Sequence, residues 1–276
     1  MAGKKKDTSL LHHLIGSRSL VWNLAKMTSR RSFRLLLWCG LAFVQPVITV
    51  LLYWFVFEKG LNSKATDLRT GIEIPFVLWL TAGLVPWFYF QEALNGGTGV
   101  LVEYSYLVKK VVFQIDMLPV VKMISALFTH LFFVAFTIVL FICMGYMPDW
   151  YALQVVYYSF CMILFATGLV YATSAVTVFF RDMKEVVGIL LQIGMWVTPI
   201  MWNFETMVQI PGWAIAVLKL NPMYYIVSGY RNALINHIGF WEDMGITVYF
   251  WVVTAVILFL GTTVFKRLRP HFADVL

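Results

Sequence analysis

Charged residues are scarce in this chain of 276 amino acids. Asp, Glu, Lys and Arg together make up 13% of it, whereas hydrophobic residues make up 61%. An average soluble domain has about 25% charged and about 45–50% apolar residues, so this sequence has too few charges to cover a water-soluble surface. Several of its uncharged runs reach the roughly 20 residues that a helix needs to cross a bilayer. The composition predicts an all-α polytopic membrane protein.

Motifs for catalysis are missing as well. The sequence contains no GxxxxGK[ST] loop for cradling phosphates, no HExxH zinc helix and no GxSxG nucleophile turn. Its five histidines are scattered along the chain. These absences exclude a built-in ATPase, give no support to an integral-membrane enzyme, and predict that the chain itself binds no cofactor or metal.

Cysteines are few, and their spacing is uninformative. Cys39, Cys143 and Cys161 lie inside apolar runs with no CxxC spacing, so neither a disulfide framework nor a zinc site is predicted. Three lysines stand at positions 4–6, but no apolar stretch of the kind that a secretory signal needs follows them. We therefore expect no cleaved signal.

Six apolar runs are candidates for membrane spans. They cover residues 35–57, 74–91, 123–147, 150–180, 186–204 and 244–265. The fourth run is longer than a bilayer requires, so we expect it to tilt or to project beyond the lipid. The runs divide the chain into an N-terminal segment at 1–34, a transmembrane domain at 35–265 and a tail at 266–276.

The lysines and arginines predict the orientation. When the termini and the even-numbered loops are placed on one side, most of the 21 basic residues gather there. The other side keeps Lys59, Lys64, Arg69, Lys219 and Arg231. The positive-inside rule then places both termini in the cytoplasm of a multi-pass inner-membrane protein. The net charge of +7 reports this topology and suits anionic lipid head groups, and it gives little support to nucleic-acid binding.

Ionisable groups inside the membrane are almost absent. The apolar runs contain no Asp, Glu, Lys or Arg, whereas transporters driven by ion gradients usually bury acidic groups near mid-membrane. Energy for transport must therefore come from a partner. His130 lies inside a run and is either a functional group or a hydrogen-bonded packing residue.

Residues 205–243 are too apolar for a solvated loop. Asn221-Pro222 divides this segment into pieces that are too short to cross the membrane separately. Such pieces are tolerated at membrane depth where protein or a water-filled cavity satisfies the freed backbone groups. We expect re-entrant helices, with a hairpin lying flat at the interface as the alternative.

Residues 17–34 have an amphipathic pattern. Leu20, Leu24 and Met27 share one helical face, and Lys26 and Arg30 lie on the opposite face. This pattern predicts an interfacial helix on the inner membrane surface, and a basic flank of the first span is the alternative.

Two predicted cytoplasmic loops are candidates for contact with a partner. After a glycine-rich break, the first combines aromatic rings with positive charge, at Tyr104, Tyr106, Leu107, Lys109, Lys110 and Phe113. Charge alone does not require these rings, which favour a short coupling helix docked on a protein; an ordinary basic loop is the alternative. The second is a tight turn with charges at Arg181, Asp182, Lys184 and Glu185. These charges are either a second contact or caps of neighbouring helix ends.

Aromatic residues make up 17% of the chain. Rings without formal charge offer an apolar face and a polar edge, and could line a path for a polyhydroxylated or phosphate-bearing polymer. The alternative is an aromatic belt at the membrane interfaces. The candidates for a substrate channel are Trp54, Trp87, Phe88, Tyr89, Trp196, Trp202, Tyr224 and Arg231.

The sequence resembles a known family. The order of LVKKVVF, FFRDMKEVVGILLQIGMWVTPIMW and LNPMYYIVSGYRNALI is similar to that in the polysaccharide-export branch of the type-2 ABC transporter permeases, over essentially the whole chain. Within this branch it looks most like the permeases that translocate wall teichoic acid, with O-antigen and capsule exporters close behind. One departure is Gln114, where the family pattern has proline.

The resemblance implies a transport subunit in a bacterial cell membrane that works as a homodimer with two ATP-binding ABC subunits. ATP and magnesium would bind those partners, and a lipid-pyrophosphate-linked polymer would pass between the two permease copies. It also implies a coupling helix at 104–113, the interfacial helix at 17–34 and the re-entrant helices at 205–236. An O-antigen or capsule exporter is the alternative within the family. Small-molecule export and a membrane enzyme or scramblase that needs no motor are further alternatives.

Overall fold

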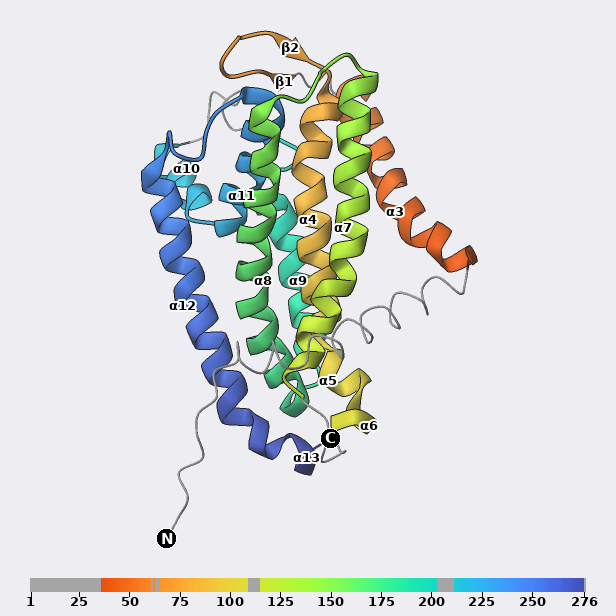
Figure 1. Ribbon diagram of the computed structural model, residues 1–276, viewed down its shortest axis with the longest axis vertical. Helices are drawn as coiled ribbons and strands as arrows, with labels where there is room; N and C mark the ends of the chain where they lie inside the picture. Colours follow the sequence, from red (N-terminus) through yellow and green to blue (C-terminus); the bar gives the residue numbers. More distant parts are fainter. Residues whose placement is uncertain (1–35, 61, 63–64, 109–114, 203–210, 276) are drawn as a thin grey trace.

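The computed structural model describes residues 36–60, 62, 65–108, 115–202 and 211–275. The predicted interfacial helix at 17–34 lies outside these residues. The molecule is an elongated bundle whose long helices alternate in direction along its main axis (Figure 1). The hairpin of β1 (Ala65–Thr66) and β2 (Glu73–Ile74) lies at one end, called the hairpin end here. The short helices α5 (Val100–Glu103), α6 (Ser105–Val108) and α13 (Phe272–Val275) lie at the other, called the tail end.

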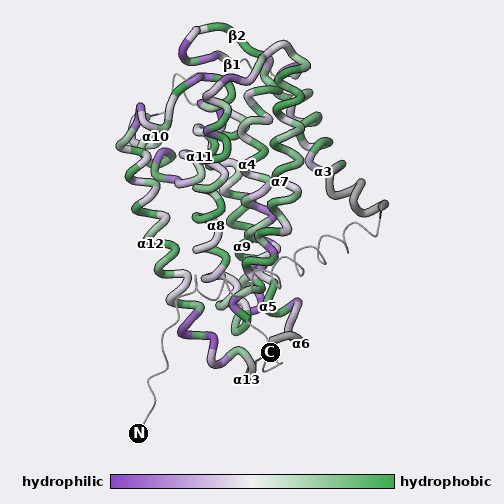
Figure 2. Tube along the Cα trace, in the orientation of Figure 1, coloured by the Kyte–Doolittle hydropathy of each residue, from purple (hydrophilic) through white to green (hydrophobic). Residues whose placement is uncertain are grey.

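A helix lies at each of the six predicted apolar runs. The helices are α3 (Leu36–Trp54), α4 (Phe76–Thr98), α7 (Met117–Cys143), α8 (Gln154–Phe179), α9 (Met183–Val197) and α12 (Met244–Leu268). Three helical segments of the described residues are long and apolar enough to cross a membrane, at Met117–Cys143, Trp150–Phe179 and Met244–His271. Figure 2 shows that the shafts of the helices are mostly hydrophobic and that hydrophilic residues gather at the hairpin and at the tail end of α12.

Several helix boundaries differ from the predicted ones, and α7 runs from Met117 to Cys143 rather than from residue 123 to 147. The fifth helix, α9, ends at Val197 rather than near residue 204. Thr198 is extended, with φ −75° and ψ 128°. The ring of Pro199 disfavours helical backbone angles in the residue before it. The second helix, α4, runs past the predicted end at residue 91 as far as Thr98.

Shorter elements connect these helices. At the hairpin end, β1 and β2 pair antiparallel, with Ala65 opposite Ile74 and Thr66 opposite Glu73. The short elements are η1 (Phe55–Gly60), β1 (Ala65–Thr66), β2 (Glu73–Ile74), α5 (Val100–Glu103), α6 (Ser105–Val108), η2 (Trp150–Leu153), α10 (Gly212–Lys219), α11 (Pro222–Arg231), η4 (Asn232–Asn236), η5 (Arg269–His271) and α13 (Phe272–Val275).

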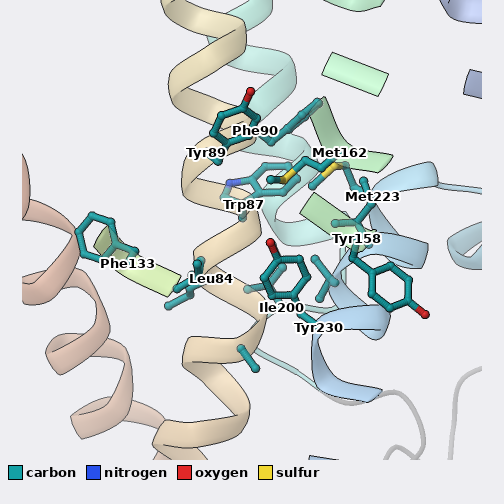
Figure 3. Close-up of a cluster of buried hydrophobic side chains, with 14 of the residues drawn as sticks. Leu84, Trp87, Tyr89, Phe90, Phe133, Tyr158, Met162, Ile200, Met223 and Tyr230 are labelled. Atoms are coloured by element: carbon teal, nitrogen blue, oxygen red, sulfur yellow. The ribbon is translucent and has the colours of Figure 1, made fainter. Parts of the chain in front are cut away.

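The core lies around α4, α8 and α11. In the most apolar stretch of the segment that contains α8, 56% of the residues are buried, against 28% in that of α7 and 22% in that of α12. Trp87 and Tyr89 from α4, Met162 from α8 and Tyr230 from α11 meet in this core (Figure 3). Because lipid is as apolar as these side chains, close van der Waals packing rather than escape from water holds the helices together.

The interruption of the helix at Asn221-Pro222 has a local cause. The Asn221 side chain accepts a hydrogen bond from the backbone N–H of Met223 at 3.0 Å and caps the start of α11. Proline at the first position of a helix gives up no hydrogen bond. The Asn221 amide also donates to the Thr198 hydroxyl at 2.8 Å. The start of α11 is thereby fixed to the turn that follows α9.

Candidate functional site

The first predicted partner contact lies on α5 and α6 at the tail end. Val100 and Leu101 are fully buried and hold α5 against the bundle. Tyr104 and Tyr106 have ring centroids 6.2 Å apart, and Tyr106 is 55% exposed. The element therefore has a fixed base and an exposed ring. Leu107 belongs to α6, while Lys109, Lys110, Phe113 and Gln114 lie outside the described residues.

The second predicted contact lies beside the first. Its charged residues, Arg181, Asp182, Lys184 and Glu185, are all exposed at the start of α9. The Asp182 side chain makes no hydrogen bond that caps this helix. A methyl group added at Gly99 would lie 3.6 Å from the Lys184 Cδ, so this turn borders the base of α5. The structure brings the two predicted contacts together on one surface.

The tail packs against the same end of the molecule. Phe272 of α13 is fully buried, with its ring 5.4 Å from that of Phe265 and 6.2 Å from that of Phe179. Arg269 donates to the Asp116 carboxylate at 2.7 Å. These contacts fix the tail against α8 and the start of α7, at the same end of the molecule as α5, α6 and the turn before α9.

A groove of about 360 Å³ lies between α3 and the rest of the bundle. In Figure 1, α3 leans away from α4 and α7, and we call this space the α3 groove. Its polar side chains are Thr49 of α3, Gln91, Glu92 and Asn95 of α4, and Thr129 of α7. Tyr53, Phe88 and Phe133 add aromatic rings. The α3 groove therefore combines hydrogen-bonding groups with apolar ring faces.

Glu92 is exposed within the α3 groove, near the middle of the bundle. Its Oε1 accepts a hydrogen bond from the Thr129 hydroxyl at 3.4 Å. Thr129 lies near the middle of the 27-residue helix α7, about 18 Å from its start at 1.5 Å per residue. An ionisable side chain at this depth is by default a functional candidate. Sequence reasoning missed Glu92 because the second run was ended at Gln91; the apolar Ala93 and Leu94 that follow were the available signal that the helix continues.

The aromatic channel candidates of α4 separate into two groups. Trp87 and Tyr89 are each 2% exposed and pack inside the subunit (Figure 3). Phe88 is half-buried and lines the α3 groove. Trp87 and Tyr89 thus act as packing residues in this structure, and Phe88 is the ring of this run that a ligand in the groove can reach.

The remaining candidates lie toward the hairpin end. Trp54 is half-buried, and its Nε1 donates to Glu58 at 2.7 Å. Trp196 is 56% exposed on α9. Trp202, Tyr224 and Arg231 line one cavity of about 240 Å³ together with Trp79 and Asn236. The structure therefore does not bring all of the aromatic candidates into one path.

Arg231 is 7% exposed and joins three elements. Its guanidinium donates to the carbonyl oxygens of Pro199 and Ile200, each at 2.7 Å. It also lies 3.3 Å from the centre of the Trp79 ring, in a cation–π contact. Arg231 therefore fastens α11 to α4 and to the turn after α9, while its edge borders the cavity at the hairpin end.

His130 is a hydrogen-bonded residue of the core. Its Nε2 lies 3.0 Å from the Tyr230 hydroxyl and 3.3 Å from the Ser159 hydroxyl, and those two hydroxyls are 2.6 Å apart. His130 itself is 2% exposed. This network links α7, α8 and α11, which favours the packing interpretation. Among the described residues, no group of three His, Cys, Asp or Glu side chains could hold a metal ion.

A family comparison agrees with this architecture. Residues 18–235 match the sequence model of the ABC-2 type transporter family. The chain belongs to the ABC-2 type transporter family. Membership makes it a multi-pass permease of a bacterial membrane and implies a partner ATP-binding ABC subunit.

Relatives of this ABC-2 type permease are named as O-antigen export permeases. This chain is 25% identical over 256 residues to the O-antigen export system permease protein RfbA of Myxococcus xanthus, and the match covers 93% of each chain. It is 20% identical over 233 residues to the protein of the same name from Klebsiella pneumoniae, covering 84% of each. The similarity extends over nearly the whole length of these permeases.

Proposed function

We propose that this ABC-2 type permease is the membrane subunit of an ATP-driven exporter of a lipid-linked polysaccharide. The similarity to an O-antigen export permease over 93% of both chains carries this proposal. The cargo would be linked to lipid pyrophosphate and would cross the cytoplasmic membrane while still attached to that lipid. An O-antigen-type glycan fits the relatives better than wall teichoic acid, which was the first expectation from the sequence, and a capsular polysaccharide is the other member of this class.

The proposed path lies between two copies of the permease. Within the described bundle, α4 and α8 fill the centre with large side chains such as Trp87, Tyr89 and Met162. A passage wide enough for a glycan therefore needs a second copy, and two-fold symmetry is the simplest arrangement. Exposed apolar faces on α3 and α9, including Leu52, Ile189 and Ile193, are available for contact with lipid or with that copy.

The energy would enter at the tail end. ATP and magnesium bind the partner subunit, and none of the residues of this chain takes part in hydrolysis. The partner-contact surface, formed by α5, α6 and the turn before α9, would receive the motion of the motor. Because α5 is fixed by buried side chains, a push on its exposed face would reach α4 and α7 as a rigid-body displacement.

The proposed membrane arrangement follows from the charge pattern. We place all six long helices across the bilayer, with both termini and the tail end in the cytoplasm. The short helices α10 and α11 would be re-entrant at the outer side, and residues 17–34 would lie along the inner surface, in contact with anionic lipids. Lys266 and Arg267 at the end of α12 suit a cytoplasmic helix end in charge and in dipole.

Surface display of the polymer tests the proposed function. A strain that lacks the permease should recover glycan on its outer surface when the permease and its ATP-binding subunit are both supplied. It should not recover when the subunit is supplied in a form that cannot hydrolyse ATP. Polymer that reaches the outer surface without ATP hydrolysis would instead support a scramblase, and conversion of the lipid-linked glycan by the purified permease alone would support an enzyme.

A further inference from the structure

The α3 groove places a carboxylate, two carboxamides and two threonine hydroxyls beside aromatic rings at mid-height in the bundle. We propose that this groove binds uncharged, hydroxyl-rich sugar residues of the moving polymer, and that Glu92 selects against polymers rich in phosphate. This assignment rests on the proposed export function and makes it more specific. It names the class of cargo, which similarity to other permeases at 20–25% identity leaves open.

The first step concerns the hydrogen-bonding capacity of Glu92. Within the described part of the chain, its hydrogen-bond partner is the Thr129 hydroxyl at 3.4 Å, which is the long end of hydrogen bonding. A carboxylate has about four acceptor sites and donates none. Most of these sites are therefore open to a ligand that brings donors, and neighbouring hydroxyl groups of a sugar are such donors.

The second step concerns the neighbours of Glu92. Gln91 and Asn95 line the same groove, and each carboxamide can both donate and accept. Asn95 follows Glu92 by three positions, so both lie on one face of α4. Carboxamides add direction to the binding of hydroxyl groups without adding charge.

The third step concerns size and the apolar surfaces. A volume of about 360 Å³ falls in the range of about 300–1,000 Å³ that small-molecule sites occupy, and it is far larger than a bare ion requires. Phe88 and Phe133 line this space, with ring centroids 6.0 Å apart. Aromatic faces suit the C–H faces of sugar rings. The combination of rings and uncharged polar groups fits a sugar residue better than a metal ion.

The fourth step concerns charge. The residues that line the α3 groove include no lysine or arginine within the described part of the chain. Lys122, about two turns from Thr129 on α7, is paired with Glu103 at 2.9 Å. A phosphate group in the groove would therefore lie beside the exposed Glu92 carboxylate, and Lys122, which acts on Glu92 from a distance, is already paired with Glu103. Like charges at short range repel. An uncharged sugar meets no such repulsion.

The test uses the permease with its ATP-binding subunit, reconstituted together in proteoliposomes. Two probes are supplied on the side of the ATP-binding subunit: a polyprenyl-pyrophosphate-linked neutral oligosaccharide, and the same lipid carrying a poly(glycerol phosphate) chain of similar length. The transported amount of each is measured with ATP present. We expect the wild-type complex to prefer the neutral probe by about tenfold or more.

Charge variants at the groove then separate selection from packing. Glu92→Gln keeps the shape and should lower the preference for the neutral probe by about tenfold. Glu92→Lys should reverse it. Asn95→Asp adds a second carboxylate on the same face and should strengthen the preference, an outcome that a damaged fold cannot imitate. Thr137→Val is the control, because Thr137 is buried on α7 away from the groove and its hydroxyl has no hydrogen-bond partner among the described residues; it should leave the ratio unchanged.

The outcomes distinguish the two proposals. Equal transport of both probes by the wild type, or the same probe ratio in Glu92→Gln, Glu92→Lys and Asn95→Asp as in wild type, overturns the role of the groove and leaves polymer export standing. A preference for the phosphate-rich probe overturns the role of Glu92 in the same way. Transport of neither probe by the complete complex overturns the proposed function together with the inference.

Discussion

At the scale of single residues, Arg231 holds elements of the fold together, although the sequence made it a candidate for the substrate channel. Its guanidinium reaches the carbonyl oxygens of Pro199 and Ile200 and lies on the Trp79 ring. A planar, always charged fork can make these contacts together, whereas a lysine ammonium cannot. Arg231 is buried, so a side chain that cannot replace its guanidinium would leave the carbonyl groups of Pro199 and Ile200 without hydrogen-bond partners.

Arg231→Lys should therefore destabilise the fold. We expect a loss of about 3 kcal/mol from unsatisfied buried groups, seen as a lower midpoint of thermal unfolding in detergent. Arg269→Lys is the control, because the Arg269–Asp116 pair is 45% exposed on the arginine side and such pairs contribute at most about 1 kcal/mol. If Arg231→Lys unfolds like the wild type but abolishes export, Arg231 contacts the cargo instead.

The carboxyl group of Asp67 should make the stability of the hairpin end depend on pH. Burial raises the pKa of its carboxyl group, but hydrogen bonds from the Thr70 hydroxyl and the Arg69 and Thr70 amides outweigh burial and leave the pKa below the ordinary 3.8. Because the pKa is lower in the folded state than in the unfolded state, the carboxylate stabilises the hairpin at pH values above the unfolded pKa. This contribution is lost as the pH falls through the folded pKa.

The same carboxylate can be tested at neutral pH. Asp67→Asn should increase amide hydrogen exchange in residues 65–74 by about fivefold or more, because charge-assisted hydrogen bonds become neutral ones. Lowering the pH of the wild type from 5 to 3 should begin to loosen the same segment, after correction for intrinsic exchange rates. Unchanged protection in both experiments would show that the carboxylate does not hold the hairpin.

Which aromatic ring of α4 faces the α3 groove could not be predicted from the sequence. Four consecutive rings at positions 87–90 point in directions about 100° apart on a helix, so some must face the core whatever the rotation. The contacts of α4 with α8 and α11 set that rotation, and they bury Trp87 and Tyr89 while Phe88 lines the groove. The hydrogen bond between Glu92 and Thr129 depends on the same rotation and was invisible for the same reason.

At the scale of elements, the closest approach is the crossing of α8 and α12. A Cβ atom built on Gly261 would lie 2.0 Å from the backbone oxygen of Gly168. Only glycine fits such a distance, so the two helices pack backbone to backbone, as small residues allow in membranes. This contact joins the central helix of the core to the last long helix.

Gly261→Ala should separate these helices and lower stability by about 2 kcal/mol or more, as overpacking does. The same substitution at Gly188 on α9 provides the control, since no atom of the described residues lies within 4 Å of its added methyl group. Gly188→Ala should be neutral or stabilising by up to about 1 kcal/mol, because alanine favours helix. Equal unfolding midpoints for the two variants would contradict the close crossing.

The existence of the long helices was predictable, and some of their ends were not. A helix lies at each of the six uncharged runs, and three of the described helical segments are long and apolar enough to cross a membrane. The end of α9 was a readable signal that was overlooked, since Pro199 stops a helix before itself. The prediction missed the extension of α4 to Thr98 because it ended the helix at the polar pair of Gln91 and Glu92, although the apolar Ala93 and Leu94 indicate that it continues.

At the scale of the whole molecule, the partner-contact surface is where the fold and the proposed motor would meet. Replacing both Lys109 and Lys110 by glutamate should reduce copurification of the ATP-binding subunit by about tenfold, while membrane insertion stays intact. Lys59→Glu is the control, because Lys59 is an exposed lysine near the opposite end. Unchanged copurification and unchanged export would remove the coupling role from this segment.

The most direct measurement is photo-crosslinking of the polymer to the permease during export. A photoreactive amino acid is placed at Phe88 in the α3 groove or at Phe259, which is 69% exposed on α12. In cells with an active ATP-binding subunit, we expect glycan adducts at position 88 that disappear when ATP hydrolysis is blocked, and none at position 259. Equal adducts at both positions, or none at position 88 while polymer still reaches the surface, would contradict a path along the groove.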